Sequence, residues 1–120
     1  MATLNWGMIG GGEGSQIGPA HRLGARLDAD FEFVAGALDH RPDAGRAYGQ
    51  KLGLAADRSY GDWTEMLAGE KRRADRLDLV TVATPNATHF AITKAFLEAG
   101  FNVLCEKPIG LTLQTADDIL

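Results

Sequence analysis

The stretch IGGGEGS at residues 9–15 directly follows an apolar run, Leu4 to Ile9, and precedes a segment with helical character. Glycines at such a junction let backbone N–H groups approach a pyrophosphate, and the N-terminus of the following helix adds partial positive charge. A tight turn that binds nothing also uses glycines, so the stretch alone leaves both interpretations open. What it predicts directly is a strand, a turn and a helix in succession, the first part of a βαβ unit.

The match of this stretch to the dinucleotide fingerprint G-x-G-x-x-G is incomplete. Gly10 and Gly12 fit the first two glycine positions, but Ser15 stands where the third glycine or an alanine belongs. Gly14 and Gly18 indicate a longer turn before the helix. The predicted cofactor contacts in this turn are Gly10, Gly12, Gly14, Ser15 and Ile17.

Short apolar runs alternate with helix-like segments along the rest of the chain, and this alternation favours parallel βαβ units. Further strands are expected at 31–38, 58–60, 79–82 and 102–105. Other helices are expected to start near Pro42, Asp62, His89 and Thr112. The first helix carries its small and apolar residues on one face, at Ala20, Leu23, Gly24 and Leu27. The predicted fold is α/β, a Rossmann-type doubly wound, mostly parallel sheet with helices on both faces, formed by residues 1–120 as one dinucleotide-binding domain.

The bulk composition excludes several other classes of protein. The chain has 120 residues and a net charge of −4, with acidic and basic residues mixed along its length. This charge pattern gives no footprint for nucleic acid or an anionic membrane, and no apolar run approaches a membrane span. The histidines and the single cysteine lack ligand-like spacing, so no metal site is expected. One cysteine and the absence of a signal-peptide pattern point to a reducing cytoplasm.

Asp39 stands just past the second expected strand, where a carboxylate can accept hydrogen bonds from the ribose hydroxyls of an adenosine. The alternative is that Asp39 merely caps the helix that begins at Pro42. A carboxylate here repels a 2′-phosphate and so favours NAD over NADP, whereas the nearby Arg41 can accommodate that phosphate or stack on adenine. The predicted contacts at this point are Asp39, His40 and Arg41, with NAD preferred and NADP left open.

Two later motifs each follow an expected strand. Val82-Ala83-Thr84-Pro85-Asn86-Ala87-Thr88-His89 ends one strand, and Cys105-Glu106-Lys107-Pro108 ends the next. Both motifs fall on the edge of the sheet where ligands bind in open α/β folds. Together with the glycine turn and Ala20-His21-Arg22, they resemble the glucose–fructose oxidoreductase/inositol dehydrogenase (Gfo/Idh/MocA) family over essentially the whole chain.

The resemblance implies particular roles for these motifs. Lys107 is the implied catalytic residue, beside the nicotinamide ribose and the reacting carbon, where it helps hold the substrate hydroxyl and assists proton movement. Glu106 lines the nicotinamide side, and Pro108 often follows a cis peptide bond. The other implied contacts around the nicotinamide ribose are Thr84, Pro85 and Asn86, with His89 at the start of the adjoining helix. Apart from any family, a cation near an alcohol favours its alkoxide-like transition state as hydride leaves.

Some of these residues keep a second interpretation. His89 also fits a helix-start residue bonded to nearby backbone, and Asn86 also fits a helix cap. His21 is expected to be a structural residue of the first helix, and Cys105 a small buried hydrophobic residue. The core is expected to include Trp63, Phe90 and Phe96.

The sequence therefore predicts the cofactor domain of an NAD(P)-dependent oxidoreductase that moves hydride between a nicotinamide and a hydroxyl or keto carbon. The resemblance implies a sugar- or polyol-like substrate and a second α+β domain that carries the acid/base residue. That domain lies outside these 120 residues, so the chain is expected to be a fragment of a longer protein with little turnover alone. Assembly into a homo-oligomer is left open.

Two alternative functions remain open. A non-catalytic nucleotide-binding module would use the same glycine turn without hydride transfer. An S-adenosylmethionine-dependent methyltransferase would share the early glycines and the acid after the second strand. A methyltransferase does not require Thr84-Pro85-Asn86 or Glu106-Lys107-Pro108.

Overall fold

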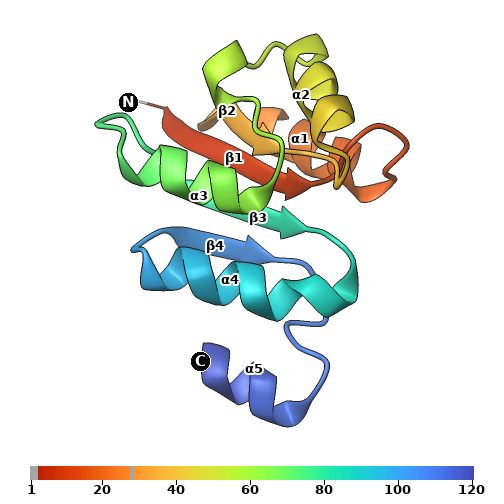
Figure 1. Ribbon diagram of the computed structural model, residues 1–120, viewed down its shortest axis with the longest axis vertical. Helices are drawn as coiled ribbons and strands as arrows, with labels where there is room; N and C mark the ends of the chain where they lie inside the picture. Colours follow the sequence, from red (N-terminus) through yellow and green to blue (C-terminus); the bar gives the residue numbers. More distant parts are fainter. Residues whose placement is uncertain (1–2, 28) are drawn as a thin grey trace.

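The computed structural model describes residues 3–27 and 29–120, which form one parallel sheet with helices packed against it (Figure 1). The strands are β1 (Leu4–Gly10), β2 (Phe31–Ala37), β3 (Leu79–Ala83) and β4 (Asn102–Cys105). Their order is β2-β1-β3-β4, and every neighbouring pair is parallel. The helices are α1 (Ile17–Leu27), α2 (Pro42–Lys51), α3 (Trp63–Lys71), α4 (His89–Glu98) and α5 (Leu113–Ile119), with short 3-10 turns η1 (Ala56–Arg58) and η2 (Asn86–Thr88).

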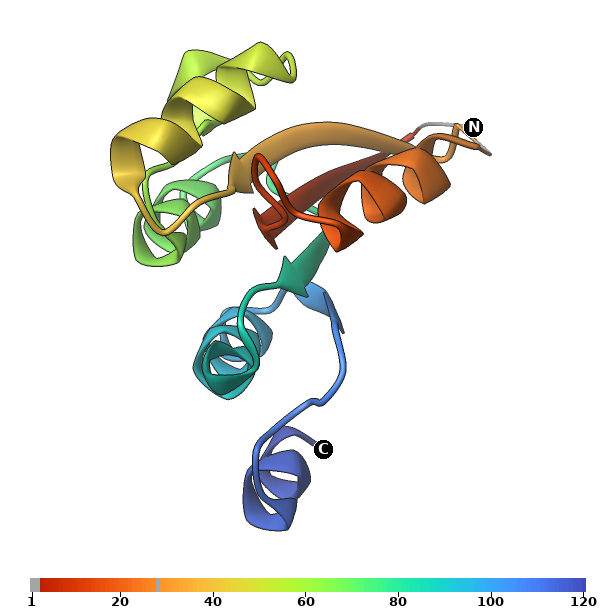
Figure 2. The ribbon, with the colours of Figure 1, turned by 90° about the vertical axis from the view of Figure 1, so that its right-hand side faces the viewer.

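The two faces of the sheet carry separate apolar cores, because successive side chains of a strand point to opposite sides. Met8 belongs to the core that includes residues of α1 and α2. Its neighbour Ile9 belongs to the other core, with Met66 of α3 and the fully buried Phe96 of α4. Figure 2 shows α1 on one side of the sheet and α3 and α4 on the other. The predicted doubly wound α/β fold, with helices on both faces, is confirmed.

The helix boundaries that rest on local signals are confirmed. Pro42 is the first residue of α2, and Gly53, with φ +99°, follows its end. Gly100, with φ +91°, ends α4 in the same way. Thr112 caps α5 through its side chain, which accepts a hydrogen bond from the Thr115 N–H at 3.1 Å.

The face of α1 that packs on the sheet is not the one expected. Leu23 and Leu27 are 57% and 76% exposed, whereas Gly18 is buried against the backbone of Gly11. The side of the helix toward the sheet consists of the buried or half-buried residues Gly18, His21, Arg22 and Ala25.

The strand expected at 58–60 is reduced to a single bridge between Ser59 and Gly36 of β2, because residues 56–58 form the turn η1. Arg58 is turned inward, where its Nη2 and Nε donate to the two carboxylate oxygens of Glu70 at 2.6 and 3.1 Å. Tyr60 donates to the same carboxylate at 2.7 Å. Burial, and then the hydrogen bond to Glu70, raise the pKa of the Tyr60 hydroxyl.

We call Arg58, Tyr60 and Glu70 the buried ion cluster. Glu70 is 0% exposed and the other two residues are each 6% exposed. The cluster joins the segment before α3 to the far end of that helix, and so sets how α3 lies along the sheet. The start of α3 has the expected cap, since Asp62 accepts from the Glu65 N–H at 2.8 Å. The Glu65 carboxylate does not complete a capping box, because it pairs with Arg46 of α2 at 3.0 Å.

The C-terminal helix α5 lies beyond α4 and away from the sheet (Figure 1). Leu113 and Leu120, on the apolar face expected for this helix, are 79% and 97% exposed. No helix within residues 3–27 and 29–120 has the length and apolar character needed to cross a membrane.

Candidate functional site

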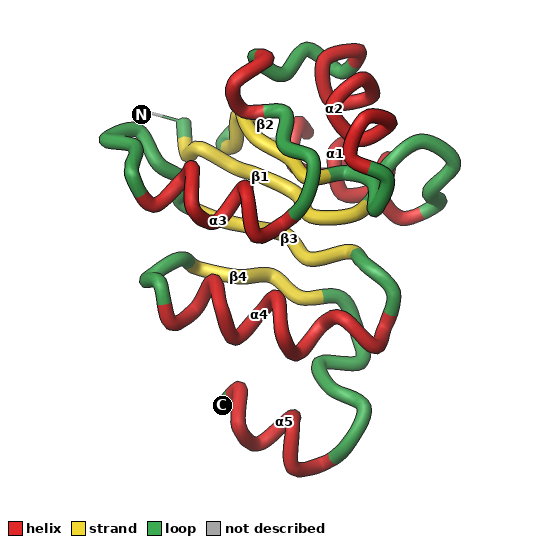
Figure 3. Tube along the Cα trace, viewed as in Figure 1, coloured by secondary structure: helices red, strands yellow, loops and turns green. Residues whose placement is uncertain are grey.

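A cleft of about 630 Å³ opens where β1, β2 and β3 end. The loops that follow the strands gather at the right-hand end of the sheet in Figure 3. Parallel strands present all their carboxyl ends at one edge, and β1 has a neighbour on each side reached by crossovers in opposite directions. The cleft is lined by the glycine turn after β1, the end of β2, the start of α3 and the segment after β3. This is the switch point at which open α/β sheets bind ligands.

The predicted contact residues divide into those that line the cleft and those that do not. The lining includes Gly10, Gly12, Ser15, Asp39, His40, Thr84 and Pro85. Outside the lining lie Gly14, Ile17, Arg41, Asn86, His89, Glu106 and Lys107. The cofactor roles of both groups stay predictions, and the contacts of each residue show what it does in the chain itself.

The glycine turn is longer than the fingerprint, as the misplaced Ser15 suggests. Left-handed backbone angles occur at Gly10, Gly11 and Gly14, with φ of +80°, +70° and +87°. The Ser15 N–H donates to the Gly12 carbonyl at 3.0 Å, and the Ser15 hydroxyl accepts from the Gly18 N–H at 3.0 Å. Ser15 therefore closes the turn and helps to start α1.

Gly18 takes the packing role that the fingerprint gives to its third glycine. A Cβ on Gly18 would overlap the carbonyl oxygen of Gly11, so only glycine lets α1 approach the turn. The same Gly11 carbonyl accepts a hydrogen bond from Nη1 of Arg22 at 2.8 Å. The Arg22 guanidinium also lies 5.8 Å from the centre of the Tyr48 ring. Two residues of α1 thus hold the turn in place, Gly18 by close packing and Arg22 by a hydrogen bond from its guanidinium.

Asp39 and Arg41 form a two-pronged pair at the other end of the cleft. Arg41 donates to Oδ1 from Nε at 3.1 Å and to Oδ2 from Nη2 at 2.9 Å, and its backbone N–H donates to Oδ1 at 2.9 Å. These hydrogen bonds, those of the guanidinium first, lower the pKa of Asp39 to about 2. Asp39 does not cap α2, because Arg41 holds the N-cap position. The Asp39 side chain is 11% exposed and that of Arg41 is 67% exposed.

His89 lies underneath the cleft, between the two strand-end loops. It is 1% exposed, with Nε2 at 2.9 Å from the Thr84 carbonyl oxygen and Nδ1 at 2.6 Å from the Pro108 carbonyl oxygen. The interpretation as a helix-start residue bonded to nearby backbone is therefore confirmed. Asn86 is exposed at the first position of η2, after Pro85 in the N-cap position, so the interpretation of Asn86 as a cap is wrong.

The segment after β4 is held at its flanks. The Glu106 N–H donates to the Val82 carbonyl at 2.9 Å, and the Glu106 carboxylate lies 2.7 Å from Nε2 of His21. The peptide bond between Lys107 and Pro108 is cis, as the resemblance implies. Lys107 is exposed. Cys105 is half-buried and packs against the core.

The start of α3 is the part of the cleft that the sequence analysis missed. Asp62 and Trp63 line it, and Trp63 also packs against the core, which is the role predicted for it. The signal that could have found them is position, since both follow the short chain segment beside β2 and so reach the ligand-binding edge. Among the residues that the structure describes, no group of histidine, cysteine and carboxylate side chains is arranged to hold a metal ion.

The comparison with protein families matches residues 4–120 to the Gfo/Idh/MocA model, described as an oxidoreductase family with an NAD-binding Rossmann fold. The match covers nearly the entire chain, including the glycine turn and both strand-end motifs. It is therefore independent support for the resemblance seen in the residues.

Individual relatives agree with this match. An inositol dehydrogenase homolog from Azotobacter vinelandii, solved with NADH and myo-inositol, has a TM-score of 0.94 and 49% identity over 98% of this chain and 31% of its own. An uncharacterized oxidoreductase of Bacillus subtilis is 44% identical over 97% of this chain and 30% of its own length. The D-xylose 1-dehydrogenase (NADP(+)) of Hypocrea jecorina is 35% identical over 95% of this chain and 29% of its own length. The chain thus spans about a third of the length of these relatives.

Proposed function

The chain belongs to the Gfo/Idh/MocA oxidoreductase family, and we propose that its cleft binds NAD(H) as the cofactor domain of a dehydrogenase. The proposal rests on one observation, that three elements suited to a dinucleotide meet at the same edge of the sheet. There a glycine turn that opens a helix, a carboxylate after β2 and the Thr84-Pro85 segment line one cleft. In the strand order β2-β1-β3, the carboxylate, the glycine turn and the Thr84-Pro85 segment follow one another as do the adenosine ribose, pyrophosphate and nicotinamide ribose of a dinucleotide.

At the pyrophosphate, the N-terminus of α1 supplies backbone N–H groups and partial positive charge. The helix has 11 residues and begins at Ile17, directly after the turn that Ser15 closes. Gly12 lines the cleft, and a Cβ there would overlap the Leu38 carbonyl oxygen, so the turn needs glycine to lie this close to β2. A bulkier residue would push the turn away from the position that the phosphates need.

At the adenosine, Asp39 accepts hydrogen bonds from the ribose hydroxyls and repels a 2′-phosphate, which favours NAD. Both of its oxygens accept hydrogen bonds from the Arg41 guanidinium. The Arg41 side chain is largely in solvent, so the ribose can displace it at little cost. Once displaced, the guanidinium is available to stack on adenine or to meet a 2′-phosphate, which keeps NADP as the second choice.

At the nicotinamide, Thr84 and Pro85 flank the ribose and the segment from Glu106 to Pro108 lies beside the reacting carbon. The cofactor, when bound, accepts or donates hydride. Lys107 places a cation beside the substrate hydroxyl, holds it and stabilises negative charge on its oxygen in the transition state. His89 lies beneath these groups and holds the two segments together, because its ring nitrogens contact the carbonyl oxygens of Thr84 and Pro108.

For the full-length protein we propose a sugar- or polyol-like alcohol as the substrate and a reducing, cytoplasmic setting. Relatives include an inositol 2-dehydrogenase from Rhizobium meliloti as well as the D-xylose 1-dehydrogenase. The acid/base residue and most substrate contacts belong, in this proposal, to a further domain that closes over Lys107. The 120-residue chain alone is then expected to bind cofactor with little or no turnover of any polyol.

The test is a titration of the chain with NADH and then with NADPH, followed by tryptophan emission. The signal is expected from Trp63, which lines the cleft, since Trp6 lies on the opposite face with its Nε1 bonded to Thr81 at 2.8 Å. NADH is expected to bind more tightly than NADPH. Asp39→Ala is expected to weaken NADH binding roughly tenfold to hundredfold, the scale of hydrogen bonds to a charged group.

The matched control is Asp43→Ala, which removes a fully exposed carboxylate from the start of α2. It is expected to leave both affinities unchanged. Tighter binding of NADPH than of NADH would transfer the assignment to Arg41 and reverse the cofactor preference. Failure of the folded chain to bind either nucleotide would contradict the proposal.

A further inference from the structure

Neighbouring residues on α1 hold two different loops at the ligand-binding edge. Arg22 donates to the carbonyl oxygen of Gly11, in the glycine turn. His21, one residue earlier, pairs with the carboxylate of Glu106 in the loop after β4, with 2.7 Å between Nε2 and Oε1. One helix thus contacts the segment proposed for the pyrophosphate and the segment proposed for the nicotinamide.

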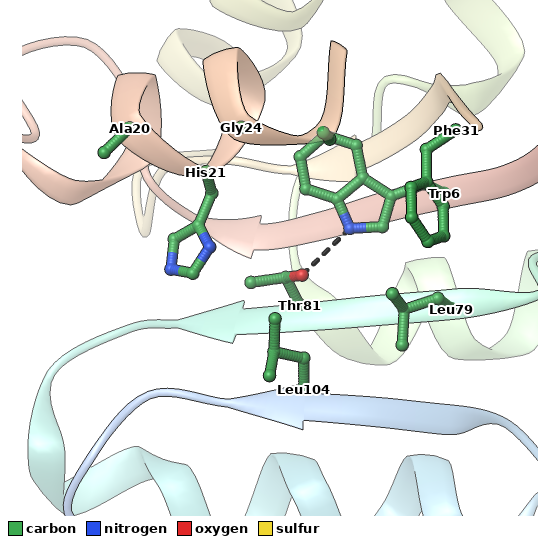
Figure 4. A pocket seen from close by; sticks show the side chains of 9 residues that line it. Trp6, Ala20, His21, Gly24, Phe31, Leu79, Thr81 and Leu104 are labelled. Carbon is green, nitrogen blue, oxygen red and sulfur yellow. Dashed lines mark hydrogen bonds between the residues drawn. The ribbon is translucent and has the colours of Figure 1, made fainter. Parts of the chain in front are cut away.

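The surroundings of His21 offer few hydrogen-bond acceptors for its ring. Figure 4 shows the ring reaching from α1 toward the sheet, beside Thr81 and Leu104. It lines a hollow of about 300 Å³ whose other residues are almost all apolar. The Thr81 hydroxyl there already accepts a hydrogen bond from Trp6 Nε1 at 2.8 Å, drawn as the dashed line in Figure 4. The Glu106 carboxylate is the strong acceptor that remains within reach of Nε2.

Glu106 is also the residue whose side chain needs to be held. Its backbone is fixed by the hydrogen bond to Val82, but its carboxylate stands at the end of a rotatable side chain, 28% exposed. The His21 side chain is 19% exposed, so the pair is partly shielded from water, which strengthens the interaction over that of a surface pair. Lys107 follows immediately, and the Pro108 carbonyl beyond it lies against His89. The Glu106–Pro108 segment is therefore braced by a histidine at each end.

We propose that His21 is a positioning residue for the nicotinamide end of the site. It sets the direction of the Glu106 carboxylate and, through it, the path of the chain that presents Lys107. The inference rests on the proposed function and extends it to a residue of α1 that lies outside the cofactor cleft. It gives His21 a more specific part than the structural role expected from the sequence.

The proposal predicts different effects at the two ends of the dinucleotide, so two ligands that differ at one end can test it. NADH reaches the Glu106–Pro108 segment with its nicotinamide, whereas ADP-ribose carries the adenosine, pyrophosphate and second ribose but no nicotinamide. We would measure both dissociation constants for the 120-residue chain and for His21→Ala. NADH binding is expected to weaken about tenfold, the scale of one lost hydrogen bond to a charged group, and ADP-ribose binding to change less than about twofold.

Further variants check the physical cause. His21→Gln keeps a side-chain donor and is expected to restore NADH binding to within about threefold of the unsubstituted chain. In a double-mutant cycle, Glu106→Gln combined with His21→Ala is expected to cost less than the sum of the two single changes. Arg26→Ala, which removes an exposed side chain from the last turn of the same helix, is the matched control and is expected to change neither dissociation constant.

The outcomes distinguish this inference from the proposed function. If His21→Ala weakens ADP-ribose as much as NADH, His21 supports α1 as a whole and the positioning role is wrong. The role is equally overturned if NADH binding is unchanged. If the unsubstituted, folded chain binds neither ligand, the proposed function itself fails and the inference fails with it.

Discussion

The chain contains two ion pairs of the same type, each between an arginine and a carboxylate. One joins Arg58 to Glu70 and the other joins Arg41 to Asp39. In each, a guanidinium donates to both oxygens of one carboxylate. Glu70 is completely buried and receives Tyr60 as a further donor, whereas the side chain of Arg41 is 67% exposed beside the cleft.

Burial decides whether such an ion pair holds the fold together or can exchange its partner. A buried carboxylate with all its partners is held in one arrangement, since removing any partner leaves charge unpaired in a medium that solvates it poorly. An exposed partner can exchange its hydrogen bonds for water at little cost. The first pair is therefore suited to fixing α3 in place, and the second to releasing a carboxylate to an incoming ribose.

The largest effect is expected from breaking the buried pair. Glu70→Ala leaves the buried Arg58 charge with only the exposed Asp75 carboxylate, 3.4 Å away, as an acidic partner, and is expected to lower the free energy of unfolding by roughly 3–5 kcal/mol. Urea denaturation followed by circular dichroism would measure this. Glu98→Ala is the control, because it breaks the exposed Lys94–Glu98 pair and is expected to cost less than about 0.5 kcal/mol. Equal losses in the two variants would contradict the comparison.

An intermediate effect is expected where the cleft itself depends on tight packing. Gly18→Ala places a methyl group onto the Gly11 carbonyl oxygen and is expected to lower the free energy of unfolding by about 1–3 kcal/mol. It is also expected to weaken NADH binding, because the turn must move. Thermal unfolding and the nucleotide titration would measure the two effects.

Gly24→Ala is the matched control on the same helix. A Cβ on Gly24 meets nothing within 4 Å, and alanine in a helix interior is expected to stabilise it by about 0.5–1 kcal/mol. Opposite signs for the two substitutions would support the role given to Gly18. A loss of stability from Gly24→Ala as large as that from Gly18→Ala would remove it.

The smallest effect on stability is expected from breaking the exposed pair. Arg41→Ala is expected to change the free energy of unfolding at pH 7 by less than about 1 kcal/mol. The pKa of Asp39, lowered to about 2, should rise only partway toward its usual value of 3.8, because the backbone N–H of residue 41 still donates to its carboxylate. Carbon NMR of the carboxyl group across a pH titration would measure it.

The sign of the pH dependence follows from that lowered pKa. The Asp39–Arg41 pair stabilises the fold at pH values above the usual carboxyl pKa. This stabilisation is lost as the pH falls toward 2, because Asp39 then takes up a proton. The unsubstituted chain and Arg41→Ala should therefore differ most above pH 4 and converge in acid. A loss above about 2 kcal/mol at pH 7 would show that this pair is structural, like the buried one.

Features that depend on neighbouring residues could be predicted from the amino-acid sequence. Glycines after β1, Pro42 at the start of α2 and Gly100 after α4 act through local backbone geometry, so their elements could be predicted. The alternation of apolar runs and helices implies a parallel sheet, and a parallel sheet brings the strand-end motifs to one edge. The predicted contacts that line the cleft, such as Asp39 and Thr84, belong to this group.

Contacts between distant residues depend instead on how the whole chain folds. The sequence placed an apolar face on α1, but the tight approach of Gly18 to Gly11 turned His21 and Arg22 inward and left Leu23 in solvent. Whether Arg58 continues a strand or turns inward depends on Glu70, which lies on another element. Pairs such as His21 and Glu106, 85 residues apart, leave no periodic trace in the chain. Their contact depends on how closely helix and sheet pack, and that distance is set by the whole fold.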